Sequence, residues 1–149
     1  MDSWINSFYV GEYTRQMDEK MRVAMPSKWR PEGSEAAFLA LPNPLGCLTV
    51  YPPKMVTRLE EKVAQVSLGD TAGQMALAKL FSKADIFSCD SKGRVKLEER
   101  LLRFAQIATE AVFVGGGAVF NIWSPERFKE YIANESLDDV TGVLKGLGL

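Results

Sequence analysis

Residues 18–23 read D-E-K-M-R-V and residues 90–95 read D-S-K-G-R-V, so one short pattern occurs twice at an offset of 72 residues. Aspartate, lysine, arginine and valine recur at the same places in both copies. The offset continues downstream, where C-L-T-V-Y-P-P at 47–53 aligns with V-F-N-I-W-S-P at 119–125. Two separate blocks that match in one register predict an internal repeat, in which both halves of the chain have the same fold.

Each copy predicts two strands joined by a turn at the aspartate, followed by a hairpin and a helix. In the first copy we expect strands at residues 8–17 and 22–25 with a turn at 18–21 between them. A short helix at 27–30, a hairpin at 36–51 and a helix at 53–66 follow. In the second copy we expect strands at residues 81–89 and 94–97 with a turn at 90–93 between them. A helix at 97–108, a hairpin at 111–123 and a final helix from Ser124-Pro125 follow. A further helix at residues 70–80, capped by Asp70 or Thr71, joins the copies.

This pattern predicts an α+β protein that is rich in strands and has flanking helices. We expect a first module at residues 1–68, a linker helix at 69–80 and a second module at 81–134. The remaining residues, 135–149, form a tail that we expect to be frayed, because three glycines weaken its helical pattern.

The composition excludes several classes of enzyme and metal protein. The 149 residues contain no histidine, which removes Ser-His-Asp and Cys-His catalysis within one chain and any zinc site that needs an imidazole. The two cysteines, Cys47 and Cys89, are too few for a zinc site made of thiolates alone. We expect both to be reduced core residues, and we expect no catalytic activity, cofactor, metal or small-molecule substrate.

The chain is 46% apolar, 25% charged and 10% aromatic, which suits a packed core and argues against wholesale disorder. Its longest apolar runs span only a few residues, so we expect no membrane-spanning helix. The first residues, M-D-S-W-I-N-S-F-Y-V, lack the basic start and long apolar stretch of a signal peptide. We therefore expect a cytoplasmic protein without a membrane partner.

The repeated D-x-x-x-R loop is the strongest candidate site. A turn between two strands would present the lysine and the arginine to solvent, where a guanidinium suits phosphate oxygens and the O6/N7 edge of guanine. The alternative is a structural pair, in which the aspartate caps the turn and the arginine bonds back to it. On the first interpretation the DNA-binding residues are Arg15, Lys20, Arg22, Lys92 and Arg94, and Asp18 and Asp90 orient the turns.

Charge counting favours the DNA-binding interpretation. The whole chain has 18 basic and 19 acidic residues, a net charge of −1, so no global positive field would attract nucleic acid. Between Arg15 and Arg30, however, five basic residues stand against two acidic ones, and the same excess recurs between Lys92 and Arg103. Positive charge therefore gathers around the two copies of the loop.

Three other features have a simpler structural explanation. The run G-G-G at 115–117 resembles a phosphate-binding loop, but no Lys-Ser or Lys-Thr follows it, so we expect a hairpin turn. Asp18 and Asp90 could form a hydrolytic pair only with a raised pKa, whereas each has a lysine and an arginine close by in the sequence. We expect three large aromatic residues to be core or subunit contacts rather than base-stacking platforms: Trp29, Tyr51 and Trp123.

The chain to about Asn134 also resembles the MraZ family of bacterial transcriptional regulators, which is built from two tandem SpoVT-AbrB-like modules. In the first copy the resemblance rests on G-E-Y (11–13), M-D-E-K-M-R-V (17–23), P-S-K-W-R (26–30) and C-L-T-V-Y-P (47–52). In the second copy it rests on F-S-K-A-D (81–85), C-D-S-K-G-R-V (89–95), V-F-V-G (112–115) and F-N-I-W-S-P-E-R-F (120–128).

This resemblance implies a pseudo-two-fold barrel of two interlocked modules. It implies a ring-shaped homo-oligomer that binds double-stranded DNA at short repeated promoter boxes ahead of a cell-division and cell-wall gene cluster, and therefore a nucleoid-associated protein. In the family the arginine of the motif contacts DNA, and that arginine corresponds to Arg22 and Arg94.

The chain departs from the family pattern at two places. The glycine of D-x-K-G-R is Met21 in the first copy, so this turn cannot rely on glycine to reach a positive φ. The second copy reads V-K-L-E-E-R at 95–100, where the family commonly has a proline. The altered turn at Met21 and the net charge of −1 support an alternative function, an AbrB-like oligomeric interaction module or an antitoxin-type partner without DNA recognition.

Overall fold

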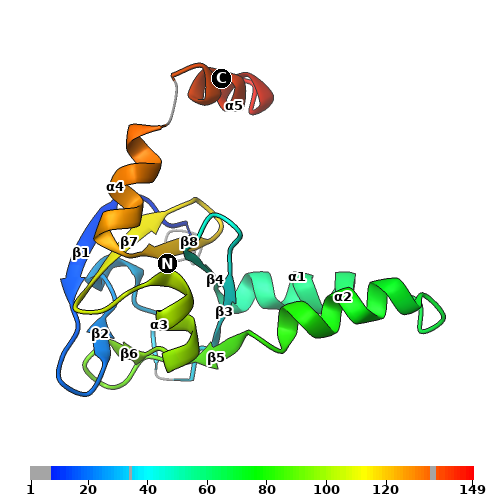
Figure 1. Cartoon of the computed structure of the whole chain (residues 1–149), viewed down its shortest axis with the longest axis horizontal. Helices are drawn as coiled ribbons and strands as arrows, with labels where there is room; N and C mark the ends of the chain where they lie inside the picture. Colours follow the sequence, from blue (N-terminus) through cyan, green and yellow to red (C-terminus); the bar gives the residue numbers. More distant parts are fainter. Residues whose placement is uncertain (1–7, 34, 135–136) are drawn as a thin grey trace.

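The structure, a computed structural model, describes residues 8–33, 35–134 and 137–149 (Figure 1). The first copy contains β1 (Glu12–Gln16), β2 (Arg22–Ala24), the 3-10 turn η2 (Ser27–Trp29), β3 (Phe38–Pro42), β4 (Leu48–Tyr51) and α1 (Pro53–Ala64). A second helix, α2 (Thr71–Phe81), leads to the second copy. That copy contains β5 (Asp85–Phe87), β6 (Arg94–Lys96), α3 (Glu99–Ala105), β7 (Glu110–Gly115), β8 (Phe120–Trp123) and α4 (Pro125–Ala133), and α5 (Leu137–Gly146) follows.

The large antiparallel sheet has the same order of elements when read from either edge. Its strands follow the order β1-β7-β8-β4-β3-β5, and the offset of 72 residues makes β1 equivalent to β5, β3 to β7 and β4 to β8. At the centre Thr49 lies opposite Asn121, and Thr49 Oγ1 donates to Asn121 Oδ1 at 2.8 Å. The repeat is therefore a structural pseudo-two-fold, with this pair close to its axis.

The two halves interlock because each half places its first strand against the hairpin of the other. Strand β1 pairs with β7, and β5 pairs with β3. A second sheet is made only of β2 and β6, one strand from each copy, with Val23 opposite Val95. Strand exchange of this kind leaves neither half with a complete sheet of its own.

The predicted α+β class is confirmed, but the strands form no closed barrel in the described part of the chain. Strands β1 and β5 are the edges of an open sheet, and the β2–β6 ribbon is hydrogen-bonded as a separate sheet. The ribbon is joined to the large sheet by side chains, since Val23 and Val95, each 1% exposed, belong to the same buried cluster as Phe113 and Phe120. Packing, rather than a continuous ladder of hydrogen bonds, closes the core.

The two copies differ most after the ribbon strands, where the first has a 3-10 turn and the second has helix α3. Pro31 explains the difference, because proline lacks an N–H and clashes with the preceding helical turn. At the equivalent place the second copy has Arg103, within α3. The expected strand at 81–89 is shorter than predicted, since Phe81 ends α2 and β5 covers only Asp85–Phe87.

Helices α1 and α2 extend together away from the sheets, and α4 leads away from them toward α5 (Figure 1). Asp70 caps α2 by accepting from the N–H of Gly73, and Ser124 caps α4 by accepting from the N–H of Arg127. Helix α5 occupies residues in the tail that we expected to be frayed. The module boundaries stay a prediction.

The expected core residues are largely confirmed. Trp29 and Trp123 are each 3% exposed, whereas Tyr51 is half-buried. Cys47 and Cys89 are buried and free, as predicted. Among the helices described, none combines the length and the apolar character that crossing a membrane requires.

Candidate nucleic-acid interface

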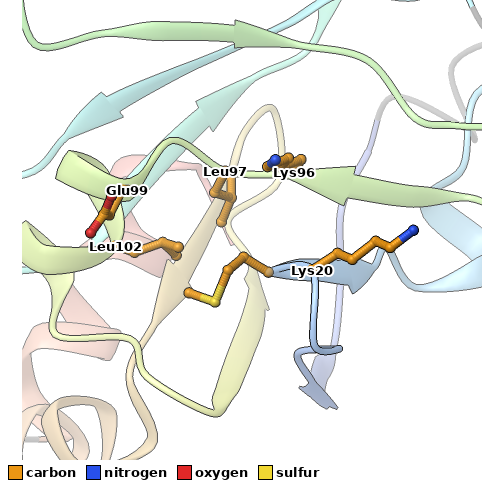
Figure 2. A pocket seen from close by; sticks show the side chains of 6 residues that line it. Lys20, Lys96, Leu97, Glu99 and Leu102 are labelled. Atoms are coloured by element: carbon orange, nitrogen blue, oxygen red, sulfur yellow. The ribbon is translucent and has the colours of Figure 1, made fainter.

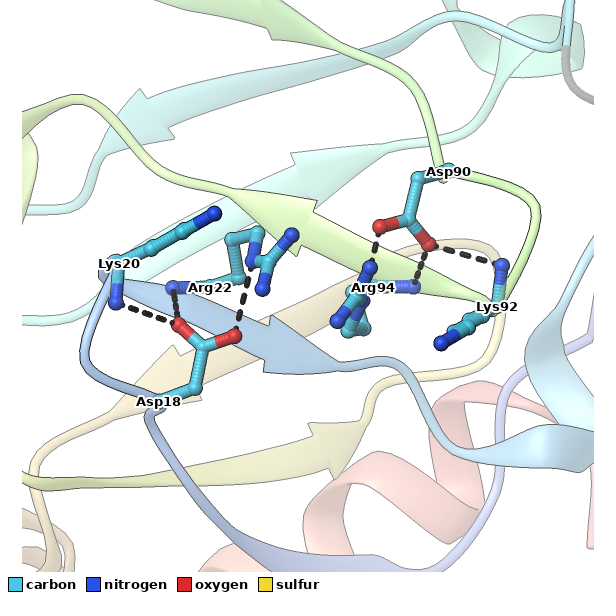
Figure 3. Close-up of polar contacts among 6 residues, drawn as sticks. All are labelled: Asp18, Lys20, Arg22, Asp90, Lys92 and Arg94. Atoms are coloured by element: carbon cyan, nitrogen blue, oxygen red, sulfur yellow. Dashed lines mark hydrogen bonds and ion pairs between the residues drawn. The ribbon is translucent and has the colours of Figure 1, made fainter.

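The aspartates of the two D-x-x-x-R loops make the same set of hydrogen bonds (Figure 3). In the first loop, Asp18 Oδ1 accepts from the backbone N–H groups of Lys20 at 2.9 Å and Arg22 at 2.8 Å. Its other oxygen, Oδ2, accepts from Arg22 Nε at 2.8 Å. Asp90 makes the equivalent bonds to Lys92 and Arg94 at 2.9, 2.8 and 2.8 Å. One carboxylate therefore closes each turn and also orients its arginine.

The backbone of each loop is a tight turn that needs a positive φ just before the arginine. The N–H of Asp18 donates to Arg22 O at 2.8 Å, and the N–H of Asp90 donates to Arg94 O at the same distance. The residue at the critical place is Met21 with φ 63° in the first loop and Gly93 with φ 77° in the second. Methionine thus adopts the conformation that glycine adopts in the other copy, at a cost of roughly 1–2 kcal/mol.

Hydrogen bonding stabilises the charged form of both aspartates. The backbone N–H of Arg22 is the largest influence that lowers the pKa of Asp18 below its ordinary value of 3.8, and the Arg22 side chain and Lys20 N–H act in the same direction. Arg94 and Lys92 lower the pKa of Asp90 in the same way. Both carboxylates are therefore ionised at neutral pH and unsuited to act as catalytic acids.

Each arginine uses only one edge of its guanidinium in the loop. Nε is bonded to the aspartate, while the Nη atoms of Arg22 and Arg94 make no hydrogen bond to any described residue. The two side chains are 27% and 29% exposed. The structural pair and the DNA contact are therefore compatible, since the aspartate aims the guanidinium and the Nη donors remain available for an external acceptor.

Pairing of β2 with β6 brings the two loops together on one ribbon. Its register places Arg22 opposite Lys96 and Arg94 opposite Ala24. The buried Val23 and Val95 point into the core, so strand alternation sends these flanking residues outward. Like charges directly opposite in a ladder are unfavourable, so the Arg22–Lys96 pair is a place where a bound anion would relieve repulsion.

Arg15 is the predicted site residue that the structure places apart from the loops. It lies in β1, opposite Ala111 of β7, where its guanidinium stacks over the ring of Tyr13 at 5.3 Å and donates to Thr14 O. Lys20 and Lys92 lie in the turns themselves. The ribbon therefore groups four of the five predicted DNA-binding residues.

Two cations next to the loops were absent from the predicted site. Lys96 lies opposite Arg22, and Arg30 lies over Gly93, where an added Cβ would meet the Arg30 side chain. Both residues were part of the local excess of positive charge in the sequence. Their positions beside the loops depend on how the two copies pair, and a count of charges along the sequence carries no information about that pairing.

The remaining candidate features have structural roles. A hairpin connects β7 and β8 at the predicted place, where Gly115 is the last residue of β7 and Gly116 and Gly117 lie in the connection. Among the described residues, no group of three or more His, Cys, Asp or Glu side chains is placed to hold a metal ion.

Comparison with known proteins relates this geometry to a family. A family model described as "MraZ protein, putative antitoxin-like" matches residues 80–142. A protein from Clostridium tetani named "Transcriptional regulator MraZ" is 31% identical over 142 residues, which cover 95% of this chain and 99% of that protein. Proteins of the same name from Clostridium acetobutylicum and Heliobacterium modesticaldum are each 34% identical, over 91% and 83% of this chain and 93% and 85% of their own lengths.

Proposed function

Because this chain belongs to the MraZ family, we propose that it is a transcriptional regulator that binds double-stranded DNA through the β2–β6 ribbon and its two aspartate-arginine turns. The observation that carries the proposal is the set of Nη donors on Arg22 and Arg94. An arginine aimed by a carboxylate through Nε offers a preorganised pair of donors to a phosphate or to the O6/N7 edge of guanine.

The surrounding charges support the same role. Lys20 and Lys92 flank the arginines, and Lys96 adds a cation directly opposite Arg22. A chain with a net charge of −1 would bind DNA through this local surface rather than through its overall field. We propose Arg15 as a peripheral contact, since it lies on β1 outside the ribbon.

We further propose that the chain acts as a ring-shaped homo-oligomer on short repeated promoter boxes of a cell-division and cell-wall gene cluster. One ribbon offers few contacts, so a single chain would bind DNA weakly. A ring would present adjacent ribbons to tandem boxes and add their contacts through a high effective concentration. Exposed apolar side chains on the outer helices, such as Met75 at 60% and Val143 at 62%, are available for contacts between copies.

The alternative, an interaction module without DNA recognition, rested on the altered turn at Met21 and on the net charge of −1. The aspartate of the first loop nevertheless makes every hydrogen bond that the aspartate of the second makes, including the 2.8 Å contact with the arginine. Methionine at this place therefore leaves the geometry of the DNA-facing arginine unchanged, and the regulator is the better supported function.

Replacing Arg22 by Ala tests the proposal. If Arg22 reads a base edge, DNA affinity falls by roughly 1–3 kcal/mol per engaged subunit, or about 5- to 150-fold, and specificity relaxes at one position. If Arg22 contacts only phosphate, binding weakens across all sequences and its salt dependence becomes shallower. Fluorescence anisotropy with the DNA upstream of the chain's own gene, at several salt concentrations, measures both effects.

Arg94→Ala is the matched variant in the second loop, and Arg58→Ala is a control at an exposed arginine of α1, a helix that extends away from the sheets (Figure 1). Thermal unfolding of each preparation separates folding from binding, and we expect Arg22→Ala to change stability by no more than about 1 kcal/mol. A large loss of stability with unchanged DNA binding by the folded fraction would show that Arg22 is only a structural partner of Asp18.

A further inference from the structure

A depression of about 540 Å³ lies between the first turn and the start of α3 (Figure 2). Its floor is apolar and charged side chains stand at its rim. The six residues that line it are Lys20, Met21, Lys96, Leu97, Glu99 and Leu102. The floor is firm, since Leu97 and Leu102 are 2% and 3% exposed and belong to the main core.

The pseudo-symmetry explains why this depression is open. At the offset of 72 residues, Met21 corresponds to Gly93 and Leu102 corresponds to Arg30. Beside the second turn Arg30 lies across Gly93, held by a hydrogen bond from its Nε to Met25 O at 3.0 Å. Leucine is too short to cross the first turn in this way. The space that arginine fills in one copy is therefore left as an apolar hollow in the other.

The charges around the hollow favour an anion. Lys96 stands at its rim with an exposed side chain, and Lys20 lines it while extending outward from Leu97 and Leu102 (Figure 2). The acidic residue of the rim, Glu99, is paired with Arg103 at 2.6 Å. A ligand would meet hydrophobic surface on one side and unneutralised ammonium groups on the other.

We propose that this hollow binds a small amphipathic anion, with an apolar tail against Met21 and Leu102 and a carboxylate or phosphate head at Lys96. Such a ligand competes with DNA for the first turn, because Lys20 lines the hollow and Lys96 lies opposite Arg22 in the ribbon. The competition rests on the proposed DNA-binding function, whereas binding of the anion does not.

Titration of the full-length protein with octanoate, followed by NMR of ¹³C-labelled methionine methyl groups, tests the site directly. We expect the Met21 methyl signal to shift and saturate, and octyl phosphate to give the same shift if either head group is accepted. Acetate supplies the charge without the tail, and octanol supplies the tail without the charge. Absence of a saturable Met21 shift with both amphipathic anions overturns the proposal, as does an equal response to acetate or octanol.

Two variants test the site, one by removing a cation from the rim and the other by introducing the side chains of the second turn. Lys96→Ala removes an exposed cation and is expected to weaken octanoate binding by roughly two- to five-fold. The double variant Met21→Gly/Leu102→Arg reproduces the arrangement of the second turn and is expected to abolish saturable binding. If that variant fails to fold, Lys96→Ala decides, and unchanged affinity in Lys96→Ala overturns the assigned position of the head group.

DNA binding then tests the competition. At saturating octanoate, compared with acetate at equal ionic strength, we expect the wild-type protein to bind DNA several-fold more weakly. Unchanged DNA affinity overturns the competition. A protein that binds octanoate at Met21 but no DNA at all refutes the proposed function and leaves the anion site standing, so the two failures are distinguishable.

Discussion

The first and second turns have the same hydrogen bonds to their aspartates, but different residues occupy the position that needs a positive φ. Both need a residue with positive φ before the arginine, and both hold that arginine at 2.8 Å from an aspartate. The second turn uses Gly93, beneath the side chain of Arg30. The first uses Met21, beside Leu102. The comparison shows that the aspartate sets the turn, while the neighbouring side chain decides which residues fit at its tightest point.

Methionine is tolerated in the first turn because there is space for its side chain beside the turn. Met21 is 39% exposed and lines the hollow above Leu97 and Leu102. An added Cβ at Gly93 would instead overlap the Arg30 side chain. A larger side chain at Gly93 is therefore expected to disturb the second turn, whereas the first turn already accommodates Met21.

Exchanging the residue in the second turn is expected to have the largest effect. Gly93→Met requires a positive φ from a β-carbon residue, about 1–2 kcal/mol, and displaces Arg30 from its hydrogen bond, about 1 kcal/mol more. We expect a loss of roughly 2–3 kcal/mol in the free energy of unfolding, measured by urea denaturation. A loss below about 0.5 kcal/mol would show that Arg30 moves aside without cost and that the turns are interchangeable.

Removing the aspartates is expected to have a smaller effect, equal in the two turns. Asp18→Ala and Asp90→Ala each delete the acceptor for two backbone N–H groups and one arginine. The freed groups are partly solvated, so water replaces some of the lost bonding. We expect similar falls in melting temperature for both variants, each smaller than that of Gly93→Met. Clearly unequal losses would show that Met21 and Gly93 change how much the turn depends on its carboxylate.

The same variants have a defined pH dependence. The pKa of each aspartate is lowered in the folded protein, so its stabilising contribution is complete above the unfolded value near 3.8 and is lost as the pH falls through the folded value. The difference in stability between wild type and Asp18→Ala is therefore expected to stay constant from pH 7 to about pH 5 and to shrink below about pH 4. A difference that persists at pH 2 would mean that the carboxylate charge is unimportant for the turn.

The smallest effect is expected from restoring glycine to the first turn. Met21→Gly removes the cost of a positive φ, but it also removes the apolar contact with the hollow and adds backbone freedom to the unfolded chain. We expect a gain of no more than about 1 kcal/mol in unfolding free energy, with DNA affinity unchanged. A loss of stability would show that the packing of Met21 outweighs its backbone strain.

Much of this architecture could be predicted from local patterns. The repeat was evident because Asp18, Arg22, Asp90 and Arg94 recur in one register, and the hairpins followed from apolar runs separated by turn residues. The capping of α2 and α4 by Asp70 and Ser124 depends on neighbouring residues alone. Errors occurred at element ends, such as Phe81, which continues α2 instead of starting a strand.

The sequence by itself therefore determined the repeat, the α+β class and the residues of the two turns, because these depend on spacing within a few positions or on one constant offset. Only the tertiary structure decided the open sheet in place of a barrel, the pairing of Arg22 with Lys96 and the unequal surroundings of Met21 and Gly93. Each of these features arises where one copy packs on the other. Contacts between segments about 72 residues apart depend on the side chains of both, and no local pattern contains them.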